Sequence, residues 1–242
     1  MTSLGNDLAW EFLQQRMQRY ERVLEISHQI TATLDHNALL KQIVQAASEL
    51  TESEAASILL LDSASGELRF EMASNMSPAE LERIVVPIDN SIAGWVVTNG
   101  QPRIIHDTRL EKGFFQNVQD QTQVMTRNLL AVPMRSHRGQ VIGALEALNK
   151  RHQRRYDDDD VRTLMLLALQ AAIAIENARL FQQSDFMAEM VHELRTPLVA
   201  LKTSAALLLR PDLPAERHDD IVHMFQAETD RLIHLTSDFL DL

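Results

Sequence analysis

The stretch that most constrains the fold runs from Asp158 to Leu209, because it contains no glycine and only one proline, Pro197. Glycine and proline are the residues that most often end a helix. The stretch therefore predicts a single helix of roughly 50 residues, about 75 Å long. Four aspartates, residues 157–160, precede or begin this helix, where their negative charges stabilise the positive end of its dipole and one of them can cap it. The basic residues before them, 150–155, are expected to form an exposed linker.

Apolar residues recur along this stretch at alternating steps of three and four, the spacing of a coiled coil. One series comprises Leu164, Leu167, Ala171, Ala174, Ala178, Phe181, Asp185 and Ala188, and a second series, displaced by one residue, comprises Val191, Leu194, Leu198, Leu201, Ala205 and Leu208. We expect a phase slip beside His192, where Pro197 also bends the helix. Either the slip marks two packings of similar energy that transmit a signal, or it is a discontinuity in a static spacer.

The C-terminal residues predict a helical hairpin. Two prolines interrupt the helix at 210–215, and a helical period then resumes through Ile221, Met224, Phe225, Glu228, Leu232, Leu235, Phe239 and Leu242. A hairpin alone leaves an apolar stripe on each helix exposed, so we expect a homodimer that forms a four-helix bundle. The pattern is still helical where the chain stops, so the second helix is expected to be truncated.

Composition and charge exclude several classes of protein. The chain has no cysteine, which excludes disulfides, thiolate metal sites and thioether-linked chromophores. Its net charge of -11 argues against a nucleic-acid-binding or anionic-membrane-binding surface. No apolar run reaches the roughly 18 to 20 residues that span a bilayer. We therefore expect a soluble, cytoplasmic protein with no membrane span.

The residues before the long stretch alternate between helical and β periods. The spacing at 6–33 fits either a coiled coil or one amphipathic helix packed on its own domain. Asp35 is the expected N-cap of a helix at 37–50, with Leu39, Leu40, Ile43, Val44 and Ala47 buried. Strands are predicted at 55–61, 67–73, 84–88, 102–106, 128–134 and 141–148, and helices at 91–99, ended by Gly100, and at 114–120. The strands predict an antiparallel sheet.

Residues 186–198, with the sequence Phe-Met-Ala-Glu-Met-Val-His-Glu-Leu-Arg-Thr-Pro-Leu, carry the candidate chemistry. In a helix, Thr196 lies on the same flank as His192, whereas Glu193 points about a quarter turn away. Pro197 has no N–H, so the carbonyl of Glu193 lacks its usual partner. An imidazole placed there can act as a nucleophile. A zinc helix of the His-Glu-x-x-His type is excluded because Thr196 occupies the second histidine position.

The order of residue types in 186–198 resembles the H box of sensor histidine kinases, which lies on their dimerisation and histidine-phosphotransfer hairpin. The resemblance covers about 184–242. It implies that His192 is the phosphoacceptor, that Glu193 is its acid/base partner, and that Thr196 helps to position the water that dephosphorylates the partner regulator. It implies two partners: a response regulator receiver domain and an ATP-binding kinase domain. The chain contains no glycine-rich phosphate cradle. ATP and Mg²⁺ belong to that absent domain, so the chain alone should not phosphorylate itself.

A second resemblance, to GAF domains, covers about 34–180. It rests on the order of four segments: Ile92-Ala-Gly-Trp-Val-Val-Thr-Asn-Gly100, Leu130-Ala-Val-Pro-Met134, Val141-Ile-Gly-Ala-Leu145 and Ala171-Ala-Ile-Ala-Ile-Glu-Asn-Ala-Arg-Leu180. It implies an antiparallel sheet of about six strands, helices on one face that form a dimer contact, and a ligand pocket under loops on the other face.

The ligand of this domain stays unknown. The set Asn149-Lys150, Tyr156 and Asp160 partly matches the signature of cyclic-nucleotide-binding GAF domains. A bilin needs a thiol in the usual families, and the chain has none. His106 or His137 are candidate haem ligands. An empty, protein-contacting GAF module is the remaining alternative, and we assign no cofactor.

The sequence thus predicts an α+β protein in three parts: an N-terminal helix at 1–33, a GAF-like sensor domain at 34–180 joined by the long helix to the next part, and a dimerising helical hairpin at 181–242. The expected function is the sensory and phosphoacceptor region of a cytosolic sensor histidine kinase. The alternative is a dimeric ligand-binding or scaffold module in which His192 is unused. A third interpretation is a cyclic-nucleotide-responsive regulator.

Overall fold

The computed structural model describes residues 14, 17, 21–26, 28–30, 33, 35–62, 65–111, 125–211 and 213–240. The chain divides into two compact units, residues 1–179 and 180–242. The helix predicted at 114–120 lies outside the described residues.

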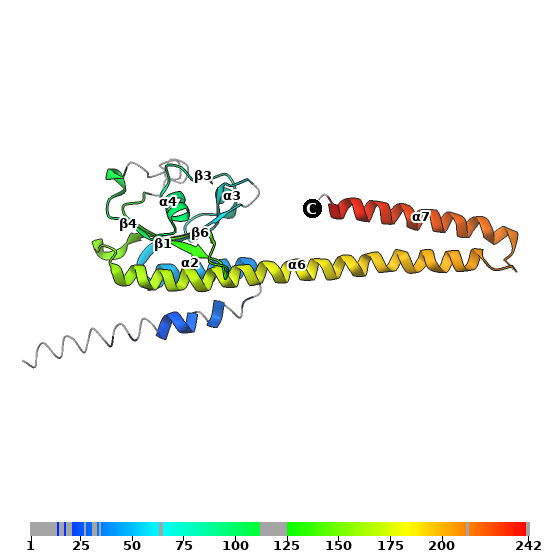
Figure 1. Ribbon diagram of the computed structural model, residues 1–242, viewed down its shortest axis with the longest axis horizontal. Coiled ribbons are helices and arrows are strands. Elements are labelled where there is room, and N and C mark those ends of the chain that lie inside the picture. Colours follow the sequence, from blue (N-terminus) through cyan, green and yellow to red (C-terminus); the bar gives the residue numbers. More distant parts are fainter. Residues whose placement is uncertain are drawn as a thin grey trace, which may run out of the picture. The chain divides into compact units, whose positions relative to one another are not determined.

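The first unit is built on a six-stranded antiparallel sheet with the strand order β3-β2-β1-β6-β5-β4 (Figure 1). The strands are β1 (Ser53–Leu61), β2 (Leu68–Ala73), β3 (Val85–Val86), β4 (Arg103–Ile105), β5 (Leu129–Arg135) and β6 (Val141–Lys150). All six predicted strands are confirmed, although β3 is shorter than expected. The two longest strands, β1 and β6, pair at the centre, so their side chains are covered on both faces of the sheet.

Helices cover both faces of this sheet (Figure 1). α2 (His36–Leu50) and the first part of α6 (Asp158–Leu208) pack on one face, where Ile58 and Leu130 point. α4 (Ile92–Asn99) packs on the other face, where Leu59 and Ala131 point. Neighbouring residues of a strand therefore serve two separate cores, as the two-residue period requires. The short helices α3 (Pro78–Leu81), η1 (Thr108–Leu110) and η2 (Arg151–Gln153) lie in the connections.

The predicted N-cap of α2 and the predicted end of α4 are confirmed, and α4 begins one residue later than expected because Ser91 is its cap. The Asp35 carboxylate accepts a hydrogen bond of 2.6 Å from the backbone N–H of Ala38 and begins α2. The Ser91 hydroxyl accepts one of 2.9 Å from Gly94 and begins α4. α4 ends at Gly100, whose φ of 62° is the left-handed conformation that favours glycine. The five residues expected on the buried face of α2 are all buried.

The prediction of one long helix is confirmed by α6, which spans 51 residues and stays helical through Pro197. Asp157 caps it, because its carboxylate accepts hydrogen bonds from the backbone N–H groups of Asp159 and Asp160, at 2.9 and 3.0 Å. The next three aspartates fall in its first turn, where they complement the helix dipole.

The first apolar series of α6 packs inside its own unit. Its members Leu164, Leu167, Ala171, Ala174 and Ala178 are at most 5% exposed and belong to the core that α2 shares. They were expected to form part of a seam between two copies, and that expectation is wrong for these five residues. Periodicity shows that a helix has an apolar face, but it does not show what covers that face.

α6 also has the length and apolarity of a membrane span over an 18-residue window, contrary to the expectation that no apolar run is long enough. Of that window, 44% is buried inside the protein. The apolar residues that fill the first core, such as Leu167 and Ile175, lie in the same helix. Packing on the sheet thus accounts for part of the apolarity of α6.

The N-terminal residues 21–26 and 28–30 are helical. Val23, Ile26 and Ile30 are buried in the core that contains α2, as expected for an amphipathic helix packed on its own domain. The coiled-coil spacing predicted for 6–33 rests on positions at steps of three and four, of which Met17 and Leu24 are each 63% exposed. Its other positions, residues 13, 20, 27, 31 and 34, lie outside the described residues.

The second unit contains the end of α6 and α7 (Ala215–Leu240), which turns back after residues 209–214 (Figure 1). Pro197 and Ser204 on α6 and Ile221 on α7 are buried. Large apolar side chains on both helices are more than a third exposed, and they include Val191, Leu198, Val199, Val222, Met224 and Ile233. The hairpin prediction is confirmed, and a single copy leaves the expected apolar surface uncovered.

Candidate functional site

The candidate phosphoacceptor residues lie on the α6 part of the second unit. His192, Glu193 and Thr196 are all exposed, whereas Pro197 is buried. Because α6 stays helical through Pro197, His192 and Thr196 stand one turn apart on one flank. The imidazole is therefore open to a partner that approaches from solvent.

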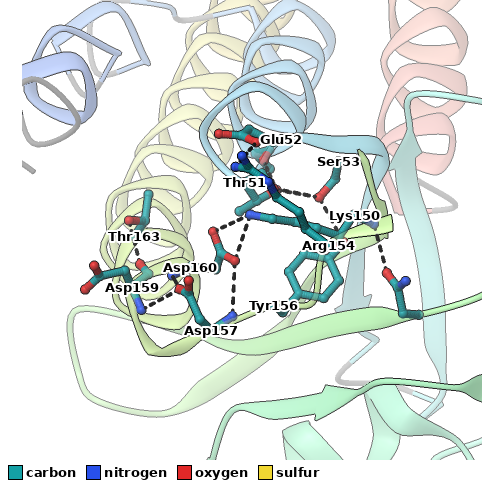
Figure 2. A network of polar contacts seen from close by, with 12 residues as sticks. Thr51, Glu52, Ser53, Lys150, Arg154, Tyr156, Asp157, Asp159, Asp160 and Thr163 are labelled. Atoms are coloured by element: carbon teal, nitrogen blue, oxygen red, sulfur yellow. Dashed lines mark hydrogen bonds and ion pairs between the residues drawn. The ribbon is translucent and has the colours of Figure 1, made fainter. Parts of the chain in front are cut away.

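A buried ion pair at the other end of α6 ties the helix to the sheet (Figure 2). Lys150 Nζ, at the end of β6, lies 2.8 Å from both carboxylate oxygens of Asp160, and the two side chains are 5% and 1% exposed. Burial raises the pKa of Asp160, although its hydrogen bond with Lys150 acts in the opposite direction. The prediction of an exposed linker is wrong for Lys150, because the start of α6 folds back onto β6.

The other residues of the partial cyclic-nucleotide signature also bond to protein groups. The Tyr156 hydroxyl lies 2.8 Å from Ser53 Oγ at the start of β1 (Figure 2). Asn149, with a φ of 59°, accepts a hydrogen bond of 2.7 Å from the backbone of Arg127 and donates one of 3.0 Å to the carbonyl of Met125. The set of residues thus joins β1, β6, α6 and the segment before β5.

Sequence reasoning missed one buried acid. Glu146, in the middle of β6, is 8% exposed and accepts a hydrogen bond of 3.1 Å from the Ser57 hydroxyl on β1. Among the described residues no basic side chain pairs with it. Burial raises its pKa to about 7, and the bond from Ser57 only partly offsets this. The sequence does contain a signal for this buried acid, because Glu146 is the single acid in the apolar run 141–148.

The two histidines considered as haem ligands are both exposed. His106 follows β4, and His137 lies in the turn between β5 and β6. Glu176 of α6 accepts the backbone N–H of His137 at 3.1 Å and contacts its ring Nδ1 at the same distance. Partial burial alone would raise the pKa of Glu176, but these bonds and the nearby charges of His137 and Arg138 lower it overall. His137 therefore links the turn to α6.

Comparison with protein families gives two matches, in the order expected from the motifs. Residues 33–176 match the GAF domain family, and residues 182–242 match the His Kinase A (phospho-acceptor) domain family. The second match contains His192, Glu193 and Thr196.

Solved structures show the same fold in the first unit. The GAF domain of a phosphoenolpyruvate-protein phosphotransferase from Coxiella burnetii is 16% identical, with a TM-score of 0.62 over 69% of this chain and 98% of that one. A GAF domain assigned to a sensor histidine kinase of Pseudomonas syringae pv. tomato is 17% identical, with a TM-score of 0.51 over 74% of this chain and 99% of that one.

A relative among characterised proteins is the dual 3',5'-cyclic-AMP and -GMP phosphodiesterase 11A of Takifugu rubripes, 24% identical over 176 residues. The match covers 68% of this chain but only 19% of the length of that relative. The GAF family match extends over more than half of the chain. The chain therefore belongs to the GAF domain family and continues into a His Kinase A phospho-acceptor domain, the domain pair of a sensor histidine kinase region.

Proposed function

We propose that this chain is the sensory and phosphoacceptor region of a cytoplasmic two-component sensor histidine kinase, in which the GAF domain controls phosphorylation of His192. The observation that carries the proposal is the exposure of His192 on α6, inside the segment that matches the phospho-acceptor family. An acceptor buried in the hairpin core would be closed to a kinase domain and to a regulator.

In the proposed reaction a ring nitrogen of His192 attacks the γ-phosphorus of ATP held with Mg²⁺ by a kinase domain. The bond to the bridging oxygen breaks, ADP leaves, and the proton on the other ring nitrogen passes to Glu193. An aspartate carboxylate of a response regulator then attacks the phosphorus, the bond between phosphorus and the ring nitrogen breaks, and the ring takes a proton back on its other nitrogen, which restores the neutral imidazole. Thr196, on the same flank, positions the water that removes the phosphoryl group from the regulator.

The proposal includes a homodimer. Val191 and Leu198 on α6 are 56% and 55% exposed, and Met224 and Ile233 on α7 are 56% and 57% exposed. An apolar surface of this kind on both helices of a hairpin is stabilised when a second hairpin covers it, as in four-helix bundles.

Transfer from a separately supplied ATP-binding kinase domain tests the function. Radiolabel from ATP should enter the wild-type chain and should be lost in His192→Ala. His223→Ala, which removes another exposed histidine on α7, is the matched control and should be labelled like wild type. Wild-type chain that stays unlabelled while a known hairpin is labelled would favour the scaffold alternative.

A cyclic nucleotide is the second candidate for the signal, favoured by the phosphodiesterase relative. Titration calorimetry of the chain with cyclic AMP and cyclic GMP tests it. Saturable heat with either nucleotide supports this signal, and its absence with both leaves the phosphoacceptor proposal intact and removes this one.

A further inference from the structure

An apolar groove of about 380 Å³ lies in the first unit, where the outer face of α6 passes the end of β5. Pockets that hold small molecules have volumes of about 300 to 1,000 Å³. The groove is therefore large enough for a small molecule. Its lining consists of Pro133, Arg135, Arg162, Met165, Leu166 and Leu169.

One wall of the groove is an apolar strip of α6. Met165, Leu166 and Leu169 are 39%, 43% and 43% exposed. Leu164 and Leu167, on the face of the helix that packs on the sheet, are fully buried. The strip is thus apolar surface that the sensor core does not use.

The other wall is the end of β5, beyond the point where β4 stops. Among the described residues β4 pairs with β5 only at 129–131, so 132–135 have no strand partner on that side. Pro133 has no N–H to donate at this edge, so a peptide added as a further strand would lose a hydrogen bond there. The groove therefore favours a small molecule over an extended peptide.

Arg135 brings a positive charge to the groove. It is half-buried and donates hydrogen bonds from Nη1 to the carbonyl of Gly139 at 3.0 Å and from Nη2 to the carbonyl of Gly100 at 2.8 Å. Both acceptors are neutral, and none of the described acids forms an ion pair with Arg135. The two bonds orient the guanidinium, whose other N–H groups can bind a carboxylate.

The charges around the groove select an anion. Arg162, on the α6 wall, is paired, because its Nη2 lies 2.6 Å from Asp159 Oδ1. No acid belongs to the lining, so Arg135 leaves it with a net positive charge. The whole chain carries a net charge of -11, so this charge is opposite in sign to that of the protein.

A second copy of the chain is a poorer occupant of the groove. In a two-fold symmetric contact the same patch faces itself. Two copies joined through the groove would bring Arg135 and Arg162 toward their own counterparts, and such like-charge contacts are unfavourable. A dissolved carboxylate supplies the opposite charge instead.

We propose that this groove binds a dissolved small carboxylate with an apolar body. The carboxylate pairs with the guanidinium of Arg135, and the apolar body lies along Met165, Leu166 and Leu169. The inference goes beyond the proposed function. α6 packs on one face of the sheet, whereas the resemblance to GAF domains implies a sensor ligand on the other face.

Titration calorimetry of the full chain with sodium decanoate, below its micelle concentration, tests the proposal. We expect saturable binding. Acetate has the same head group without the apolar body, and decyltrimethylammonium has the same apolar chain with a positive head group. Each should bind at least tenfold more weakly than decanoate, because each lacks one of the two features that the groove recognises.

Three variants locate the bound decanoate. Arg135→Gln should weaken binding about tenfold, through loss of the charge-assisted hydrogen bonds. Arg138→Gln is the matched control, because Arg138 is an exposed arginine three residues away and outside the lining, and it should bind like wild type. Leu166→Glu places a negative charge in the groove at an exposed position and should weaken binding at least tenfold with an unchanged melting temperature.

Several results would overturn the proposal. They are the absence of saturable binding, equal binding of decanoate and decyltrimethylammonium, and full binding in both Arg135→Gln and Leu166→Glu. Sedimentation equilibrium tests the other occupant. A dimer that Leu166→Glu dissociates, in a wild-type chain that does not bind decanoate, would show that a second copy covers the groove.

Discussion

Replacement of Glu146 by glutamine should stabilise the first unit at alkaline pH and leave it nearly unchanged at acidic pH. In the folded protein burial raises the pKa of this carboxyl from 4.5 to about 7. Between these two values the folded state keeps a proton that the unfolded chain has released. Stability therefore falls as the pH rises through this window, and the loss is complete above about pH 7.

The size of the effect follows from the pKa difference. A rise from 4.5 to about 7 corresponds to about 3 kcal/mol, since one pKa unit corresponds to about 1.4 kcal/mol. Glutamine cannot ionise, and its amide oxygen can still accept the hydrogen bond from Ser57. The variant should therefore be more stable than wild type by up to about 3 kcal/mol at pH 8, with little difference at pH 4.

Urea unfolding followed by the fluorescence of Trp95, on α4 in the same unit, measures this difference at both pH values. Glu54→Gln is the matched control, because Glu54 is an exposed acid on β1 paired with Arg127. This control should retain the pH dependence of the wild type. A difference between wild type and Glu146→Gln that is the same at both pH values would refute the argument that burial holds this proton.

Three further substitutions test the packing of the first unit by thermal and urea unfolding. Lys150→Met should destabilise it by about 3 kcal/mol, because it leaves the buried Asp160 carboxylate without its cation; Lys150→Met combined with Asp160→Leu should recover part of the loss. Gly94→Ala should lower the melting temperature, since its Cβ would lie 1.9 Å from the carbonyl oxygen of Ile88, and an unchanged melting temperature would contradict this contact. Asp35→Ala should cost about 1 kcal/mol through loss of the α2 cap, whereas Asp35→Asn should be nearly neutral.

Features with a local cause could be predicted from the sequence. The Asp35 cap, the Gly100 helix end and the uninterrupted α6 each depend on residues within a turn or two, and all three are confirmed. The antiparallel sheet of about six strands followed from the resemblance to a known family, but its strand order was not predicted, because strand periodicity alone does not decide which strands pair.

Features that depend on how separate elements pack together were missed. Lys150 was assigned to an exposed linker because its ion pair with Asp160 forms only when the start of α6 packs against β6. Glu146 is likewise hydrogen-bonded to Ser57, which lies on another strand. The face of α6 could not be chosen from the repeat either. Leu164 and Leu166 are both apolar, and only the packing on the sheet shows that Leu164 is buried and Leu166 stays exposed.

The roles assigned to His192, Glu193 and Thr196 stay predictions. The most direct test is to determine which residue carries the phosphoryl group. After phosphorylation by a supplied kinase domain, tryptic cleavage at Arg179 and Arg195 releases residues 180–195, in which His192 is the sole histidine. Mass spectrometry should place one acid-labile phosphoryl group on this peptide. A phosphoryl group on another histidine, or an acid-stable one on Ser184, would contradict the account.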